Sequence, residues 1–270
     1  MEVIGESGMI KLPLCPTYKV HSMLINKSEE LIVLGEYAGN DKRCYKLENG
    51  QWLNQSPLTQ ERQYSVCISM DNGIYCFGGS LSSRTSEFLP NGQCKWHEIS
   101  TIPELEISRG DGVAISPTKL IVVGGEKNEE GILEFNISNQ QWTRVGILHQ
   151  GRKDHRCFLF NGNIVVTGGR GSLFLNSTEI IKFSKDGIIT TTAGYLNVPR
   201  LYHGMGIVTI NEESRLIVFG GLTPYGRTDS IEEWDDITET WKISSLKLSQ
   251  PRAKFGYCQL PSSYTKKYQN

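Results

Sequence analysis

The sequence predicts an all-β propeller, because one short apolar pattern ending in glycine recurs along the chain at blade-sized intervals. The pattern occurs five times in the 270 residues, as LIVLGE (31–36), IYCFGG (74–79), LIVVGG (120–125), IVVTGG (164–169) and LIVFGG (216–221). The first glycines of successive copies are 43, 46, 44 and 52 residues apart. That period is typical of propeller blades built from four short strands.

The residues around each copy extend the pattern to a whole repeat. Each apolar run is too short for a buried helix and is bounded by turn residues, which indicates a strand buried on both faces. The glycine pair indicates a close backbone approach or an unusual turn. Three further markers recur: an upstream arginine, a downstream acid followed by an apolar residue (Glu87, Glu134, Glu179, Glu233), and then a tryptophan (Trp52, Trp96, Trp142, Trp241). In the second unit these markers predict strands at Tyr64 to Ser69, Gly73 to Phe77, Thr85 to Phe88 and Lys95 to Ile99.

The two ends of the chain predict how the ring closes. The repeats span about 18–59, 60–106, 107–150, 151–197 and 198–248, which leaves 1–17 and 249–270 for a closing blade. Met1 to Leu14 is similar to the third and fourth strands of a unit, and Lys254 to Leu260 to the first strand. We therefore expect six blades, with the last one shared between the termini. A five-bladed ring with extra terminal strands is the alternative, because nothing in 262–270 matches a second strand.

Composition disfavours several classes of partner and site. The 28 basic and 29 acidic residues nearly cancel, so we expect neither nucleic acid nor a membrane surface as partner. We find no apolar stretch near the roughly 20 residues of a transmembrane helix and no signal-peptide pattern, and we expect a cytoplasmic protein. The seven cysteines include no close C-x-x-C pair, which disfavours zinc, and those in strand-like runs, such as Cys67 and Cys76, are expected to be buried as small hydrophobic residues.

A search for catalytic chemistry finds no metalloprotease, phosphate-loop, nucleophile-elbow or calcium-loop motif. The glycine-rich TGGRGS at 167–172 coincides with the repeat's own glycine pair, so we interpret it as a blade loop. His155 and His203 share one column and His21 lies one residue later in the first unit, on strands expected to line the central channel. Such imidazoles could converge on a metal, but a packing role is the preferred interpretation. We therefore expect no metal, no cofactor and no enzyme.

The order of arginine, small-residue strand, apolar strand with a glycine pair, acidic strand and tryptophan resembles the kelch repeat. The resemblance covers nearly the whole chain, with Glu36 in place of one glycine and Ile188 or Ile189 in place of the fourth tryptophan. It implies a module that binds another protein, similar to the substrate-recognition half of kelch-like ubiquitin-ligase adaptors without their N-terminal domains, or to a cytoskeletal, actin-binding kelch protein. Some similar propellers are enzymes, so a sugar epimerase or isomerase with its site at the channel mouth is the alternative.

The arginine column supplies the candidate site. Five arginines take equivalent places in the repeats and would form a ring at one face of the propeller: Arg62, Arg109, Arg152, Arg200 and Arg252. One interpretation is that they bridge neighbouring blades by hydrogen bonds. The other is a basic rim that binds an acidic, peptide-like segment of another protein, because arginine forks match carboxylates. We predict partner binding by these arginines together with three nearby aromatic residues, Tyr18, Tyr64 and Tyr202.

Overall fold

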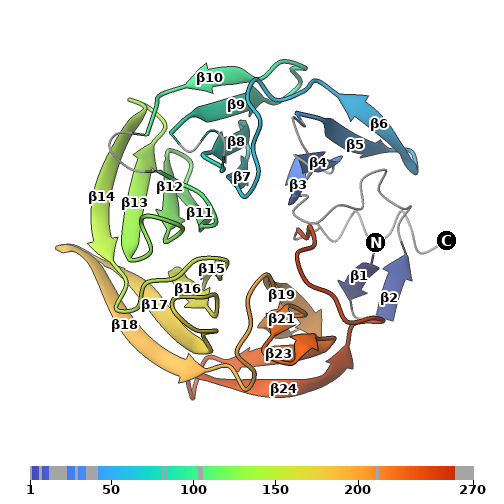
Figure 1. Ribbon diagram of the computed structural model, residues 1–270, viewed down its shortest axis with the longest axis vertical. Coiled ribbons are helices and arrows are strands. Elements are labelled where there is room, and N and C mark those ends of the chain that lie inside the picture. The colour runs from blue at the N-terminus through green and yellow to red at the C-terminus, as the bar shows by residue number, and fades with distance from the viewer. Residues whose placement is uncertain are drawn as a thin grey trace.

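Five four-stranded antiparallel sheets stand side by side around a common axis in the computed structural model (Figure 1). The structure describes residues 2–5, 8–11, 23–27, 30–34, 42–80, 82, 84–102, 106–210 and 213–258. Among these residues there is no helix long and apolar enough to cross a membrane. The all-β propeller predicted from the repeats is confirmed.

Each blade runs in chain order from the axis outward (Figure 1). The first blade contains β3 (Met23–Lys27), β4 (Glu30–Leu34), β5 (Cys44–Glu48) and β6 (Gln51–Gln55). The second contains β7 (Val66–Met70), β8 (Gly73–Phe77), β9 (Ser86–Pro90) and β10 (His97–Ile99). The third contains β11 (Asp111–Ser116), β12 (Lys119–Val123), β13 (Gly131–Asn136) and β14 (Gln141–Ile147). The strands of the second blade begin within two residues of their predicted starts.

The last two blades follow the same order. The fourth contains β15 (Arg156–Phe160), β16 (Asn163–Thr167), β17 (Ser177–Ser184) and β18 (Gly187–Tyr195). The fifth contains β19 (Gly204–Ile210), β20 (Glu213–Phe219), β23 (Ser230–Asp235) and β24 (Thr240–Lys247), with a small hairpin of β21 (Leu222–Thr223) and β22 (Gly226–Arg227) inserted after β20. Second strands such as β8 and β16 are almost wholly buried, because neighbouring strands flank them and neighbouring blades cover both faces.

The closing region differs from the six-bladed expectation. β1 (Glu2–Gly5) and β2 (Gly8–Lys11) pair with each other and lie between the fifth and first blades (Figure 1). Residues 254–258, expected to begin a first strand, form no strand, and 259–260 lie outside the described residues. The part of the chain that the structure describes thus holds five four-stranded blades and one two-stranded sheet, as in the alternative.

The glycine pairs form the backbone contacts between blades. Gly124 has φ +58°, and a Cβ on it would lie 2.6 Å from the carbonyl oxygen of Arg152 in the next blade. The N–H of Gly125 donates to that same oxygen at 2.9 Å. Equivalent bonds join Gly79 to Ile107 (2.7 Å), Gly169 to Arg200 (2.8 Å) and Gly221 to Arg252 (2.8 Å). Glycine is required because the two backbones touch in a left-handed conformation that other residues adopt with strain.

Two tryptophans of the fourth-strand column, Trp142 and Trp241, join their blades to the preceding one. The ring of Trp142 packs edge-on to Phe77 of the preceding blade, with centroids 5.0 Å apart. Trp241 donates from Nε1 to Oγ1 of Thr178, also in the preceding blade, at 2.8 Å. The hydrophobic core therefore consists of clusters between blades, which is why a single repeat cannot fold alone.

Candidate functional site

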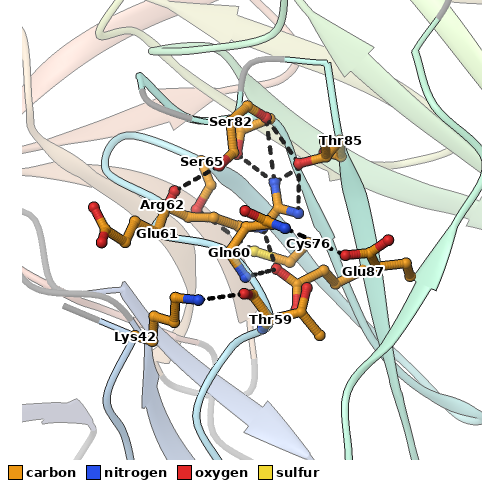
Figure 2. Close-up of polar contacts among 12 residues, drawn as sticks. Lys42, Thr59, Gln60, Glu61, Arg62, Ser65, Cys76, Ser82, Thr85 and Glu87 are labelled. Carbon is orange, nitrogen blue, oxygen red and sulfur yellow. Dashed lines mark hydrogen bonds and ion pairs between the residues drawn. The ribbon is translucent and has the colours of Figure 1, made fainter. Parts of the chain in front are cut away.

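Three of the predicted arginines are buried ion pairs inside the blades. Arg200 donates from Nη2 to Oε1 of Glu232 at 2.5 Å and from Nη1 to the carbonyl oxygen of Gly220 at 2.8 Å. In the second blade Nε of Arg62 lies 2.6 Å from Oε1 of Glu87 (Figure 2). The third pair joins Arg152 to Glu179 at 2.6 Å, and the three arginines are at most 2 % exposed. Their predicted role as rim contacts is at odds with this placement, because buried guanidinium groups cannot reach a partner.

Each pair ties a linker to its own blade. Glu87 also accepts the backbone N–H of Thr59 and of Gln60, at 2.6 and 3.2 Å, from the segment that enters the blade (Figure 2). Burial lowers the pKa of Arg152 and of Arg200, and the neighbouring carboxylate opposes that effect. We call these three arginine–glutamate pairs the struts. Their side chains act within one blade, whereas the backbone carbonyls of Arg152 and Arg200 contact the preceding blade.

The third blade has no strut. Arg109, predicted to be equivalent to Arg62, Arg152 and Arg200, lies two positions after their column. Ile107, not Arg109, accepts the glycine-pair hydrogen bond, and Leu133 occupies the register position of the strut glutamate. Ile107 and Leu133 are buried in one apolar cluster. Glu134 and Glu233, expected in the acid column, lie one residue later and pair with Lys119 and Arg215.

A second ring of residues lies two positions after the strut column. Its members all have left-handed backbones, with φ between 54° and 61°: Tyr64, Arg109, Asp154, Tyr202 and Lys254. The N–H of each later member donates to the carbonyl of the member before it, over 2.9, 2.8, 3.0 and 3.2 Å in chain order. Because these residues precede the inner strands, they surround the axis at the face that also carries the glycine-pair loops. We call them the axial ring.

Side chains of the axial ring contact one another across blades. Nε of Arg109 lies 2.8 Å from Oδ1 of Asp154, and its Nη2 lies 2.7 Å from the hydroxyl of Tyr202. The Arg109 guanidinium also stands 5.1 Å from the ring centroid of Tyr64, and Nζ of Lys254 stands 4.5 Å from that of Tyr202. The hydrogen bond with Asp154 raises the pKa of Arg109, and burial raises that of Tyr202. Arg109 is thus exposed enough to touch a partner but already neutralised.

Positive charge remains in excess on the same face. Burial lowers the pKa of Lys254, and the nearby charges of Arg109, Arg170 and Arg227 lower it further, although Asp154 acts against this. Arg170 and Arg227 are exposed, in the β16–β17 loop and in β22. Within the described part of the chain no carboxylate lies within ion-pair distance of Arg170, Arg227 or Lys254. The sequence analysis did not select Arg170, Arg227 or Lys254, although Arg170 follows a glycine pair directly and Lys254 lies two residues after Arg252.

The other predicted contact residues lie in different parts of the molecule. Arg252 is partly exposed at the end of the strut column, where its carbonyl accepts the N–H of Gly221. Tyr64 and Tyr202 are half-buried members of the axial ring. Tyr18 lies outside the described residues. The structure therefore brings two predicted tyrosines beside Arg109 but separates them from the three struts.

The histidine column packs the blades. His155 and His203 are fully buried, and each imidazole lies against a glycine pair of the preceding blade. Burial, with smaller contributions from strut arginines, lowers the pKa of both well below 6.5. His203 also hydrogen-bonds Thr167 at 3.0 Å. Among the described residues no group of three histidine, cysteine or acidic side chains could hold a metal, and His21 lies outside them.

A hollow of about 340 Å³ opens beside the fourth blade. Its lining includes His149, Phe174, Glu179 and Tyr195, so an acid and a histidine occur together there. The Glu179 carboxylate, however, already accepts bonds from Arg152, from the N–H of His149 and from the N–H of Gln150. This carboxylate therefore has a structural role. An acid and a histidine at one pocket would favour the epimerase or isomerase alternative, but the engagement of Glu179 weakens that argument.

Comparisons with known proteins place this geometry among kelch propellers. The chain is 23 % identical over 247 residues to Spermatocyte protein spe-26 of Caenorhabditis elegans, covering 84 % of this chain and 42 % of that protein. It is 29 % identical over 180 residues to human Kelch-like protein 24, covering 63 % and 28 %. Kelch repeat protein M-T8 of Myxoma virus is 20 % identical over 190 residues, covering 67 % and 36 %. The chain thus spans less than half the length of these relatives.

Structural similarity supports the same architecture. A solved structure of YjhT superposes with a TM-score of 0.75 at 15 % identity, covering 90 % of this chain and 88 % of that one, which shows the fold alone. No protein-family model matches the chain. The five in-phase repeats, the ring of blades and these relatives support a kelch-repeat β-propeller family, at modest identity.

Proposed function

We propose that the chain is a protein-interaction module whose axial-ring face binds an acidic segment of a partner protein. The observation that carries this proposal is the group of three cations, Arg170, Arg227 and Lys254, that no described carboxylate neutralises. Their mutual repulsion disfavours the free surface and would be relieved by a bound anion. We propose that this face serves a substrate-recognition role of the ubiquitin-ligase adaptor type or a cytoskeletal role, as the resemblance to the kelch repeat implies.

Arginine suits this task better than lysine. Its planar fork binds a carboxylate through two parallel hydrogen bonds, and both Arg170 and Arg227 have their side chains in solvent. Tyr202, which lies under Lys254, and Tyr64, which lies under Arg109, supply rigid aromatic surface in the axial ring, of the kind that dominates binding hot spots. Tyr225, at the tip of the β21–β22 hairpin, is 96 % exposed and adds a third aromatic contact. In this proposal Arg170, Arg227 and Lys254 take the role that was predicted for the buried arginines Arg62, Arg152 and Arg200.

The hollow beside the fourth blade gives the partner a second feature. A loop of 168–176 carries Arg170 at one end, and its Phe174 lines the hollow, with the main chains of Arg170 and Phe174 paired by a β-bridge. A carboxylate at Arg170 would therefore lie near an apolar side chain seated in the hollow. We propose a partner segment that combines acids with a bulky apolar residue.

Charge reversal tests the proposal. A short fluorescein-labelled peptide rich in glutamate and carrying one leucine is titrated into the full chain, and fluorescence anisotropy is recorded at low and moderate salt. The Arg170→Glu, Arg227→Glu variant should bind about tenfold more weakly or worse, and added salt should weaken binding to the unaltered protein.

The matched control is Arg144→Glu, an exposed arginine on β14 away from the axial ring. It should bind as tightly as the unaltered protein, and all variants should unfold at the same temperature. Equal weakening by Arg144→Glu would show a non-specific charge effect. Equal binding of a peptide with glutamine in place of glutamate would contradict an acidic partner.

A further inference from the structure

Two cysteines face each other across the inner strands of the second blade. Cys67 on β7 and Cys76 on β8 are direct register partners, and their Sγ atoms are 2.8 Å apart. Directly opposed residues of antiparallel strands have Cα atoms about 4.5–5.5 Å apart. A disulfide requires a Cα separation of about 4.4–6.8 Å. The backbone therefore already has the geometry of a cross-strand disulfide, and only the sulfurs must approach.

The surroundings of the two sulfurs differ. Cys76 is fully buried and lies beside Arg62 and Ser65 (Figure 2). Cys67 is partly exposed. The Ser65 hydroxyl lies 3.6 Å from the sulfur of Cys67 and 3.5 Å from that of Cys76. Burial raises the pKa of Cys67. At Cys76 burial also acts to raise the pKa, but the hydrogen bond from Cys67 and the charge of Arg62 outweigh it and lower the pKa.

We propose that Cys67 and Cys76 form a redox-active dithiol that a small hydroperoxide converts reversibly to an intra-blade disulfide. The oxidant approaches from the partly exposed Cys67 side. Among the described cysteines no other pair is in sulfur–sulfur contact. Cys44 packs in the same apolar cluster as Cys76, Cys157 is buried elsewhere, Cys94 is exposed and Cys258 is partly exposed. The pair thus differs from a lone thiol, which has no second sulfur to complete the reaction.

The chemistry balances with one hydrogen peroxide. The thiolate forms at Cys76, where the Cys67 hydrogen bond and Arg62 favour it, and attacks a peroxide oxygen that has entered past Cys67. The O–O bond breaks, and the departing hydroxide takes up a proton to become water. The sulfenic acid formed is then attacked by the second sulfur, the S–S bond forms, and the hydroxyl leaves with a proton as water. Two thiols are oxidised and one peroxide is reduced to two waters.

The test treats the folded full chain with hydrogen peroxide, unfolds it in an alkylating reagent and maps the products by mass spectrometry. We expect a cross-linked peptide pair joining Cys67 to Cys76, a mass loss of about 2 Da before alkylation, and recovery of both thiols with dithiothreitol. Cys94→Ser, a change at an exposed cysteine, should leave the cross-link unaffected. Cys67→Ser should abolish it.

The measurement on the unaltered protein decides the matter even if a variant folds poorly. Oxidation confined to Cys94, or irreversible sulfinic acid on Cys67 or Cys76 without a cross-link, would overturn the proposal. The outcome does not depend on partner binding, so it is independent of the proposed function.

Discussion

The third blade fills one buried position with an apolar pair, whereas its neighbours fill the same position with an ion pair. In the second, fourth and fifth blades a buried arginine reaches a glutamate on the third strand. In the third blade Ile107 and Leu133 take those two places and join an apolar cluster. Both members of the pair differ together, so the blade contains neither an unpaired arginine nor an unpaired carboxylate at this position.

The difference teaches what the arginine column does. A position that can be filled by isoleucine inside an otherwise regular blade serves packing and not recognition. A buried ion pair contributes little net stability compared with a well-packed apolar pair, but removing one partner leaves a buried charge unpaired. We therefore expect the column to be sensitive to single changes and tolerant of paired ones.

Breaking one strut should have the largest effect. Arg200→Met removes the partner of Glu232 and leaves its carboxylate buried with only backbone and amide donors. We expect the free energy of unfolding to fall by about 3–5 kcal/mol, measured by urea denaturation. Arg227→Met, at an exposed cation, should change it by less than about 0.5 kcal/mol. A similar small loss in Arg200→Met would mean that the strut is not a structural element.

The second prediction replaces the ion pair of the fourth blade with the apolar pair of the third. We expect the double change Arg152→Ile, Glu179→Leu to cost less than the more damaging single change, with a coupling energy of about 1–3 kcal/mol in a double-mutant cycle. Some loss should persist, because Glu179 also accepts the N–H groups of His149 and Gln150. Additive single effects would show that arginine and glutamate act independently.

The propeller could be predicted from sequence because its blade contacts need glycine backbones at fixed intervals, and glycine pairs are visible in a sequence. Ring closure was harder, since β1 and β2 pair with each other and residues 254–258 run without strand pairing. The number of blades therefore depended on terminal segments whose strand pattern is weak.

The site could be predicted only in part. The strut partners Arg62 and Glu87 are 25 residues apart, and nothing local marks an arginine as buried. Arg109 was misplaced by two positions, because the third blade has no arginine in the strut column and an irregular β11–β12 register lengthens its first hairpin. Glu233 was taken for Glu232, and a shift of one residue in a strand moves a side chain to the opposite face. Tyr64 and Tyr202 were selected for lying beside the arginines, and they do lie beside Arg109.

Protonation of the buried histidines should have the smallest effect on the free energy of unfolding. The blades also differ at the position after each axial-ring residue, where these histidines lie. The fourth and fifth blades place His155 and His203 there, near strut arginines, whereas the second and third place Ser65 and Gly110. Because burial holds both folded-state pKa values below the unfolded value of about 6.5, the unfolded chain binds more protons in acid. The stability contributed by the neutral imidazoles is complete above that pH and is lost as the pH falls below it.

Urea unfolding between about pH 7.5 and 5.5 measures this loss, which should approach at most about 1.4 kcal/mol per pH unit for each histidine below pH 6.5. His203→Gln removes one titrating group next to Arg200 and should flatten the slope by about half of the histidine contribution. His149→Gln, at an exposed histidine, is the matched control and should leave the slope as it is. An equal dependence of stability on pH in His203→Gln and in the unaltered protein would contradict the prediction. It would mean that His203 is not a buried neutral imidazole next to Arg200.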